Sequence, residues 1–192
     1  IKIEKNMRNH IKILILSLLF INCKAQTIVN INTYNSGNNS GKYFKDLDNN
    51  FQSFIGTWES TNDNITFRVI LSKDEQMPMG SPVKYYMDRI SGSFKIIQNA
   101  NMPNEVIIHD SVKYYAISNT TTNSVIYASS FGPNTLTGHI ENNCANNGDD
   151  FITGFLKMNI TNPGSLPALA HWKIKSRPLQ QNESFNIPTD II

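Results

Sequence analysis

Three histidines are the first candidates for chemistry in this chain of 192 residues: His109, His139 and His171. Each lies on a different predicted strand, and none has the His-x-His or His-Glu-x-x-His spacing that places two metal ligands together. The loop 141–150 is rich in Asn and Asp oxygens, but it lacks the alternating ligands and the final Glu of an EF-hand. We therefore predict no metal site, with the histidines as paired or solvent-facing strand residues.

Residues for nucleophilic catalysis form no recognisable pattern. The sequence contains no Gly-x-Ser-x-Gly elbow and no glycine-rich phosphate loop. The nearby charged residue of Cys144 is the acidic Glu141, which does not activate a thiol. Asp149 and Asp150 are adjacent, so they would point to opposite faces of a strand. We expect no catalytic residues and no cofactor, and hence a protein that is not an enzyme.

Aromatic side chains are the remaining candidates for binding. The doublets Tyr85-Tyr86 and Tyr114-Tyr115 would place one ring on each face of a strand. In the simplest interpretation one ring of each doublet fills the core and the other covers the outside. Alternatively, some of these rings line a cavity or an outer face that binds sugar or peptide. The predicted ligand-lining residues are Tyr86, Tyr114, Tyr127 and Phe131.

Charge and composition narrow the class of protein. Residues 1–22 hold four of the 17 basic and one of the 15 acidic side chains, so residues 23–192 carry 13 and 14, a net charge of −1. No basic stripe remains in that part, and we therefore expect no nucleic-acid partner. Charged residues are few, at 17%, and polar surface comes from Asn, Ser and Thr, which favour turns and short strands. Composition thus favours an all-β protein.

Residues 7–22 have the features of a secretory signal peptide. A basic start precedes the apolar run Ile13–Ile21, which is too short to span a bilayer core of about 30 Å. We expect translation to start at the methionine of this segment, so that residues 1–6 are not translated. Cys23 follows as in bacterial lipoproteins, whose thiol is acylated, and cleavage after Ala25 by ordinary signal peptidase is the alternative. We predict an exported cell-envelope protein, anchored in the outer membrane through a lipid on Cys23, or alternatively periplasmic or secreted.

The segment after the leader is predicted to be a flexible tether, because it contains a run rich in Asn, Ser and Gly. A short edge strand over Thr27–Thr33 is the alternative. Asp48 is then placed to cap one helical turn that brings Phe51 and Phe54 together. The predicted organisation is a signal peptide at 1–22, a tether at 23–50 and a folded domain at 51–192.

The stretch Phe54–Glu59 is predicted to start the first core strand. Alternation places Phe54, Gly56 and Trp58 on one face, and the glycine is expected to let another backbone come close. Full burial of the Trp58 side chain would contribute roughly 4–6 kcal/mol. We interpret these three residues as a structural motif.

Alternating apolar residues predict further strands. The clearest is Ile65–Leu71, and after a predicted loop at 73–82 a long strand follows with a bend at Gly92. Turn signals recur roughly every 8–15 residues, which predicts one antiparallel barrel or sandwich. Of the two, we favour a single antiparallel β-barrel of about 8–10 short strands. The segment Phe185–Ile192 has the pattern of the beginning of one more strand, and we expect the coding sequence to be truncated there.

Several segments resemble an uncharacterised family of exported Bacteroidetes proteins, a DUF6705-like group that carries a Gly-Thr-Trp motif. The resemblance rests on Phe54–Glu59, Ile65–Leu71, Asp88–Phe94 and Asn186–Pro188, and it covers about residues 45–192. This family has no established function to transfer.

The segment Phe54–Glu59 is also similar to the Gly-x-Trp signature that opens calycin barrels, the lipocalins and fatty-acid-binding proteins. That resemblance implies that Trp58 closes one end of a barrel whose interior holds an apolar ligand. We therefore predict a non-catalytic, calycin-like binding module for a small apolar ligand. The alternative is a structural or adaptor protein of the envelope that binds another protein or a glycan, and an enzyme is the least favoured.

Overall fold

The computed structural model describes residues 26–112, 124–130, 132–142, 152–178, 187–188 and 190–191, and this part of the chain is all-β, as predicted. Its strands are β1 (Thr27–Asn30), β2 (Lys42–Lys45), β3 (Gly56–Asn62), β4 (Ile65–Met79), β5 (Tyr85–Gln98), β6 (Val106–Asp110), β7 (Ile126–Ser129), β8 (Thr135–Asn142), β9 (Ile152–Ile160), β10 (Ala170–Ser176) and β11 (Asp190–Ile191). Two short 3₁₀ helices are η1 (Ile31–Thr33) and η2 (Asn50–Ser53). The strand expected near the C-terminus corresponds to β11.

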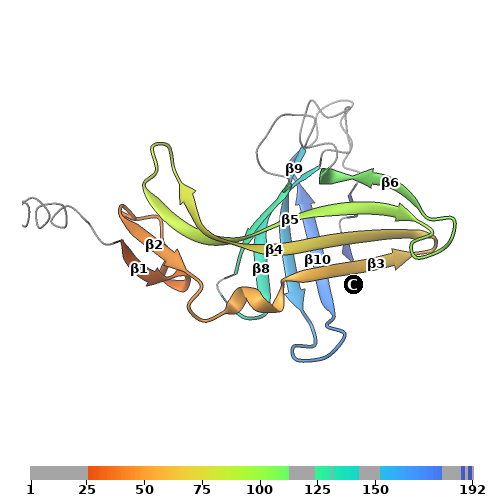
Figure 1. The fold of residues 1–192 in the computed structure, drawn as a ribbon, viewed down its shortest axis with the longest axis horizontal. Helices are drawn as coiled ribbons and strands as arrows, with labels where there is room; N and C mark the ends of the chain where they lie inside the picture. The colour runs from red at the N-terminus through yellow and green to blue at the C-terminus, as the bar shows by residue number, and fades with distance from the viewer. Residues whose placement is uncertain are drawn as a thin grey trace, which may run out of the picture.

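Strand β5 joins the parts of the sheet. One edge of β5 pairs with β4 along most of its length, and the two form a long antiparallel ribbon. The other edge is shared by three strands in turn: β2 at Tyr86 and Met87, β7 at Ile90–Gly92, and β6 at Lys95–Gln98. Figure 1 shows β3, β4 and β5 crossing in front of β8, β9 and β10. The core lies between these two groups of strands.

The sheet does not close into the predicted barrel. Its order is β1-β2-β5-β7-β8-β9-β10-β11, with β3 on the free edge of β4. Closure would need β3 to pair with β10, but the free edge of β10 takes β11 instead. Rings from the two groups pack across the interior, where the centroids of Phe67 on β4 and Trp172 on β10 lie 6.1 Å apart. The all-β prediction is confirmed, whereas closure is wrong.

The predicted tether is wrong for the described part of residues 23–50. There the chain forms β1, η1 and β2, and β1–β2 and β2–β5 pair in parallel. Ile31 and Phe44 are fully buried in the main core, and Phe44 makes edge-on contacts with Tyr34 and Tyr85. Burial of these apolar side chains offsets the conformational entropy that is lost when the Asn/Ser/Gly run between them is ordered. The alternative of a short strand is confirmed for Thr27–Asn30.

The motif around Trp58 is built differently from the prediction. Strand β3 begins at Gly56, and Phe54 ends η2 with a fully buried ring. No atom lies within 4 Å of a Cβ added at Gly56, but its φ is +131°, so the glycine serves backbone conformation and not close approach. Trp58 is half-buried, and its indole N–H donates to the carbonyl oxygen of Phe54 at 2.8 Å.

Two further local predictions need correction. The loop expected at 73–82 is mostly strand, because β4 runs to Met79 through a β-bulge between Asp74 and Met77 in which Gln76 has a φ of 54°. Asp48 does not cap η2: its carboxylate accepts hydrogen bonds from the side chains of Asn30 and Asn32. A close backbone approach occurs instead at Gly92, where an added Cβ would lie 2.5 Å from the carbonyl oxygen of Ile70.

Candidate functional site

A groove of about 640 Å³ lies on the outer face of β7–β10, next to the β4–β5 ribbon. The side chains that face outward on β9 alternate with buried Ile152, Leu156 and Met158, which belong to the core side of the same strand. The groove is lined by Met79, Met87, Arg89, Tyr127, Ala128, Ser129, Thr137, Gly138, His139, Phe155, Leu156, Lys157, Lys173 and Lys175. Its volume is in the usual range of small-molecule sites.

The pairing register arranges the outward side chains in two neighbouring rows. The first, here called the aromatic row, crosses four strands through Tyr127, His139, Phe155 and Lys175. Phe155 is 66% exposed although it is a large apolar residue, and its ring centroid lies 4.7 Å from that of His139. At the other end the guanidinium of Arg89 lies 4.7 Å above the Tyr127 ring. This row is therefore an apolar surface with a cation at each end.

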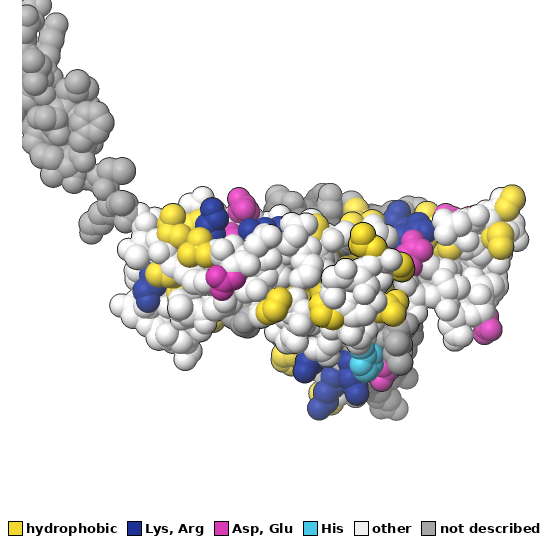
Figure 2. All heavy atoms as spheres, turned by 90° about the horizontal axis from the view of Figure 1, so that it is seen from below, with side chains coloured by type: hydrophobic (Ala, Val, Ile, Leu, Met, Phe, Trp, Pro, Cys, Tyr) yellow, Lys and Arg dark blue, Asp and Glu magenta, His cyan; other side chains and the backbone are white. Residues whose placement is uncertain are grey.

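The second row, here called the lysine row, runs through Thr137, Lys157, Lys173 and Asp190. Lys157 and Lys173 are directly opposite on β9 and β10, an arrangement of like charges that destabilises a sheet. Lys175 is two residues from Lys173 and adds a third ammonium group. Figure 2 shows Lys and Arg side chains gathered in one place beside a histidine.

Asp190 is the acidic member at the end of the lysine row. Its carboxylate lies 4.0 Å from the Lys173 ammonium and 2.5 Å from Nε2 of His171. The hydrogen bond with His171 holds the pKa of Asp190 below its usual value. The carboxylate is thus shared between two partners. None of the described residues that line the groove is acidic.

The structure brings one predicted ligand-lining residue into the groove. Tyr127 lines it, whereas Tyr86 does not, because Tyr86 is on the opposite face of β5 from Met87 and Arg89. Tyr114, Phe131 and the predicted lipidation site Cys23 lie outside the described residues.

Sequence reasoning missed the lysines and Phe155. A signal was present, because Phe155 and Lys157 alternate with apolar Leu156 and Met158, as do Lys173 and Lys175 with Trp172 and Ile174. What sequence alone lacks is the register that puts these residues side by side.

The three candidate histidines lie in different surroundings. His109 is buried and stacked on Phe94, with ring centroids 5.3 Å apart. His139 lies in the aromatic row, and His171 pairs with Asp190. Within the described ranges, no group of three His, Cys, Asp or Glu side chains could hold a metal ion. Cys144 and most of the loop 141–150 lie outside those ranges.

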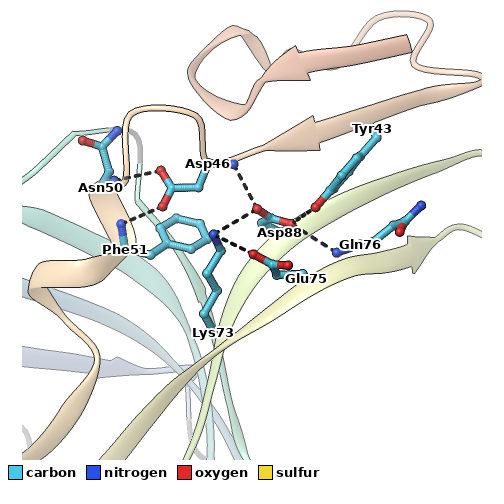
Figure 3. A network of polar contacts seen from close by, with 8 residues as sticks. All are labelled: Tyr43, Asp46, Asn50, Phe51, Lys73, Glu75, Gln76 and Asp88. Carbon is cyan, nitrogen blue, oxygen red and sulfur yellow. Dashed lines mark hydrogen bonds and ion pairs between the residues drawn. The ribbon is translucent and has the colours of Figure 1, made fainter. Parts of the chain in front are cut away.

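A buried carboxylate network is the second candidate site (Figure 3). Asp88 is fully buried on β5. Its Oδ1 accepts from the Tyr43 hydroxyl at 2.5 Å and the Gln76 backbone N–H at 3.1 Å. Its Oδ2 accepts from the Asp46 backbone N–H at 3.0 Å and lies 3.4 Å from the Lys73 ammonium. Both oxygens therefore have two partners.

The surroundings of Asp88 stabilise its charged form. Burial alone would raise the pKa of Asp88, but hydrogen bonds from Tyr43, Asp46 and Gln76 and the charge of Lys73 outweigh it and lower the pKa. Burial, together with the Asp88 carboxylate, raises the pKa of the Tyr43 hydroxyl. For Lys73, burial lowers the pKa, but its pairing with Glu75 and Asp88 outweighs this, so the pKa is raised.

This network connects the N-terminal strands to the rest of the domain. The Asp46 carboxylate accepts from the backbone N–H groups of Asn50 and Phe51 at 2.8 and 3.0 Å, and so caps η2. Asp88 thereby holds β2, the bulge of β4 and η2 together. Because its oxygens are buried and fully paired, we interpret the network as a structural latch and not as a reactive site.

Trp58 lies at the open side of the sheet. A slot of about 90 Å³ is found there between β3, β4 and the start of β10, lined by Trp58, Phe67, Met158, Leu169 and Trp172 among others. Trp58 thus covers the side at which β3 and β10 fail to pair. The motif Phe54, Gly56 and Trp58 serves packing and backbone conformation in this structure.

Among the described residues, no helix is both long and apolar enough to span a membrane. The fold and groove define an all-β domain with an open, cation-rimmed surface groove. The chain belongs to the family described as "Family of unknown function (DUF6705)", which matches residues 7–147. The match covers the segment with β1 and β2 and ends before β9, so the resemblance noted at Asn186–Pro188 lies outside it. No curated protein and no solved structure matches the chain.

Proposed function

We propose that this domain is a non-catalytic binding module for a small ligand with a large apolar part, which lies on the aromatic row of the groove. The observation that carries the proposal is Phe155, whose ring is two-thirds exposed on a sheet face within a groove of about 640 Å³. Large apolar side chains in a concave site favour an apolar ligand. The ligand is placed on the outer face because the open sheet does not form the interior of a calycin barrel.

A neutral alkyl probe tests this proposal. Decanol should bind the purified full chain at one saturable site in calorimetric titration. Phe155→Ala should weaken that binding about 5- to 30-fold, which corresponds to roughly 1–2 kcal/mol of lost apolar contact. The matched control is Leu166→Ala, because Leu166 is 97% exposed on the β9–β10 loop outside the groove. Absence of decanol binding, or equal weakening by the two substitutions, would contradict the proposal.

An adaptor role is the second candidate, and strand β6 favours it. Val106, Ile107 and Ile108 are consecutive and each about half exposed, at 54%, 49% and 50%. Within the described residues β6 pairs with β5 alone, so its other edge can accept an extended strand of a partner protein. Ile107→Lys should abolish capture of such a partner from envelope extracts and leave decanol binding unchanged. Capture that survives the substitution would exclude this edge.

We also propose that the chain is exported and anchored through a lipid on Cys23. Strand β1 begins at Thr27, four residues after Cys23, so a lipid would hold the folded part within about 14 Å of the anchor. Mass spectrometry of the mature N-terminus tests this proposal. An acylated Cys23 supports anchoring, and an unmodified chain that begins at Gln26 contradicts it.

A further inference from the structure

We propose that the ligand of the groove is an amphipathic anion: an apolar body that lies on the aromatic row and an acidic group held by Lys157, Lys173 and Lys175. This inference rests on the function proposed above and adds the charge of the ligand to it. A carboxylate and a phosphate monoester share the necessary chemistry.

The lysine row lowers the stability of the sheet. Lys157 and Lys173 face each other directly across β9 and β10, and such like-charged pairs destabilise a sheet. Residues 23–192 carry a net charge of −1, so the cluster does not reflect a generally basic domain. An acidic ligand would turn this repulsion into attraction on binding.

Within the described part of the chain, the lysines have too few acidic partners to neutralise them. Arg89 already has its own acid, because its Nε lies 3.2 Å from the Asp74 carboxylate. Asp190 is the acid described beside the lysines, and it is shared between His171 and Lys173. Lys157 and Lys175 remain as ammonium groups for which the structure shows no acidic partner among the described residues. They are placed to bind an external anion.

The position of the charges relative to the apolar surface defines the ligand class. Lys175 is directly opposite Phe155 in the β9–β10 register, which places its Cβ about 4.5–5.5 Å from that of Phe155. Lys157 is two residues from Phe155 on β9, about 7 Å along the strand. A molecule that lies on Phe155 therefore has its end beside two ammonium groups. This arrangement fits an acidic group joined directly to an apolar chain.

Amphiphiles with similar alkyl chains and different head groups test the effect of ligand charge separately from the apolar contact with the groove. Calorimetry with the full chain should show that decanoate or decyl phosphate binds at least 10-fold more tightly than decanol. The preference between the two acids shows whether the acidic group of the ligand is a carboxylate or a phosphate monoester. Lys157→Gln combined with Lys173→Gln should remove most of this difference between the acids and decanol. The matched control is Lys84→Gln, an exposed lysine in the β4–β5 turn outside the groove. The advantage of the acids should also shrink with added salt.

The outcomes distinguish the two proposals. If decanoate, decyl phosphate and decanol bind equally and Phe155→Ala weakens all of them, the groove binds apolar ligands but the inference about charge is wrong. Binding of decyltrimethylammonium as tightly as decanoate would also overturn it. If none of the amphiphiles binds, the proposed function itself fails.

Discussion

The charged groups of the Asp88 latch and of the lysine row have opposite surroundings. Asp88 is fully buried, and each of its oxygens has two partners. Lys157 and Lys173 lie opposite each other on an outer face, and Asp190 at the end of the row is shared between His171 and Lys173. Removal of one partner from a satisfied buried charge network destabilises the fold, whereas an accumulation of exposed like charge costs stability and is available to a ligand. The comparison therefore supports a structural role for the first region and the proposed binding role for the second.

The largest effect should come from the latch. Asp88→Asn removes the charge that pairs with Lys73 and puts an amide where donors from Tyr43, Asp46 and Gln76 converge. We expect the free energy of unfolding to fall by about 3–5 kcal/mol, measured by denaturant titration. Asp74→Asn, which breaks a partly exposed ion pair with Arg89, should cost at most about 1 kcal/mol. Equal costs for the two substitutions would contradict the latch.

Acid should weaken the same latch. Because the pKa of Asp88 is lower in the folded chain than its usual 3.8, the unfolded chain binds more protons between the two values. The stabilisation is therefore complete above about pH 4 and is lost as the pH falls through the folded pKa. The slope of unfolding free energy against pH in this acidic range should be smaller in Asp88→Asn. An unchanged slope would show that Asp88 is not the group responsible.

A glycine under the groove offers a sharper test of the binding face. An added Cβ at Gly138 would lie 2.3 Å from the carbonyl oxygen of Tyr127, so Gly138→Ala must move β7 away from β8. We expect a loss of about 1–3 kcal/mol in unfolding free energy and weaker decanoate binding. Gly132→Ala is the control, because nothing lies within 4 Å of its added Cβ. Normal binding by Gly138→Ala would show that the ligand does not depend on the Tyr127–His139 part of the groove.

The smallest effect should come from the lysine row itself. Lys157→Gln removes one member of the opposed pair with Lys173 and should raise the free energy of unfolding by about 0.2–1 kcal/mol at low salt. Thermal unfolding of this variant and of Lys84→Gln measures the difference. A gain in stability together with weaker decanoate binding would mark Lys157 as a residue kept for binding. Destabilisation would instead assign it a structural role.

Sequence patterns predicted much of the local structure. The strand Ile65–Leu71 follows from the alternation of apolar residues, and it is observed as part of β4, which is longer than predicted. The favoured prediction for the segment with β1 and β2, a flexible tether, was wrong, because the parallel pairing of β2 depends on partners far along the sequence, such as Tyr86 and Met87. Closure of the barrel also depends on residues far apart in sequence. The local sequences of β3 and β10 carry no signal that these two strands do not pair with each other.

The candidate site was harder to predict than the fold. Tyr127, which lines the groove, was predicted because its aromatic side chain alone marks it as a candidate for ligand binding. The lysine row was not, because Lys157 and Lys173 are far apart in sequence and become neighbours through the β9–β10 register. Asp88 was part of a resembling segment, but its burial depends on Tyr43 and Asp46, which were expected to lie in a tether.

Mapping of backbone amide chemical shifts during titration of the full chain with decanoate tests the location and the charge of the site together. We expect saturable shifts gathered at Thr137–His139, Phe155–Lys157 and Lys173–Lys175, and much smaller ones with decanol at equal concentration. Saturable shifts gathered instead at Val106–Asp110 or around Trp58, with the groove unaffected, would contradict it.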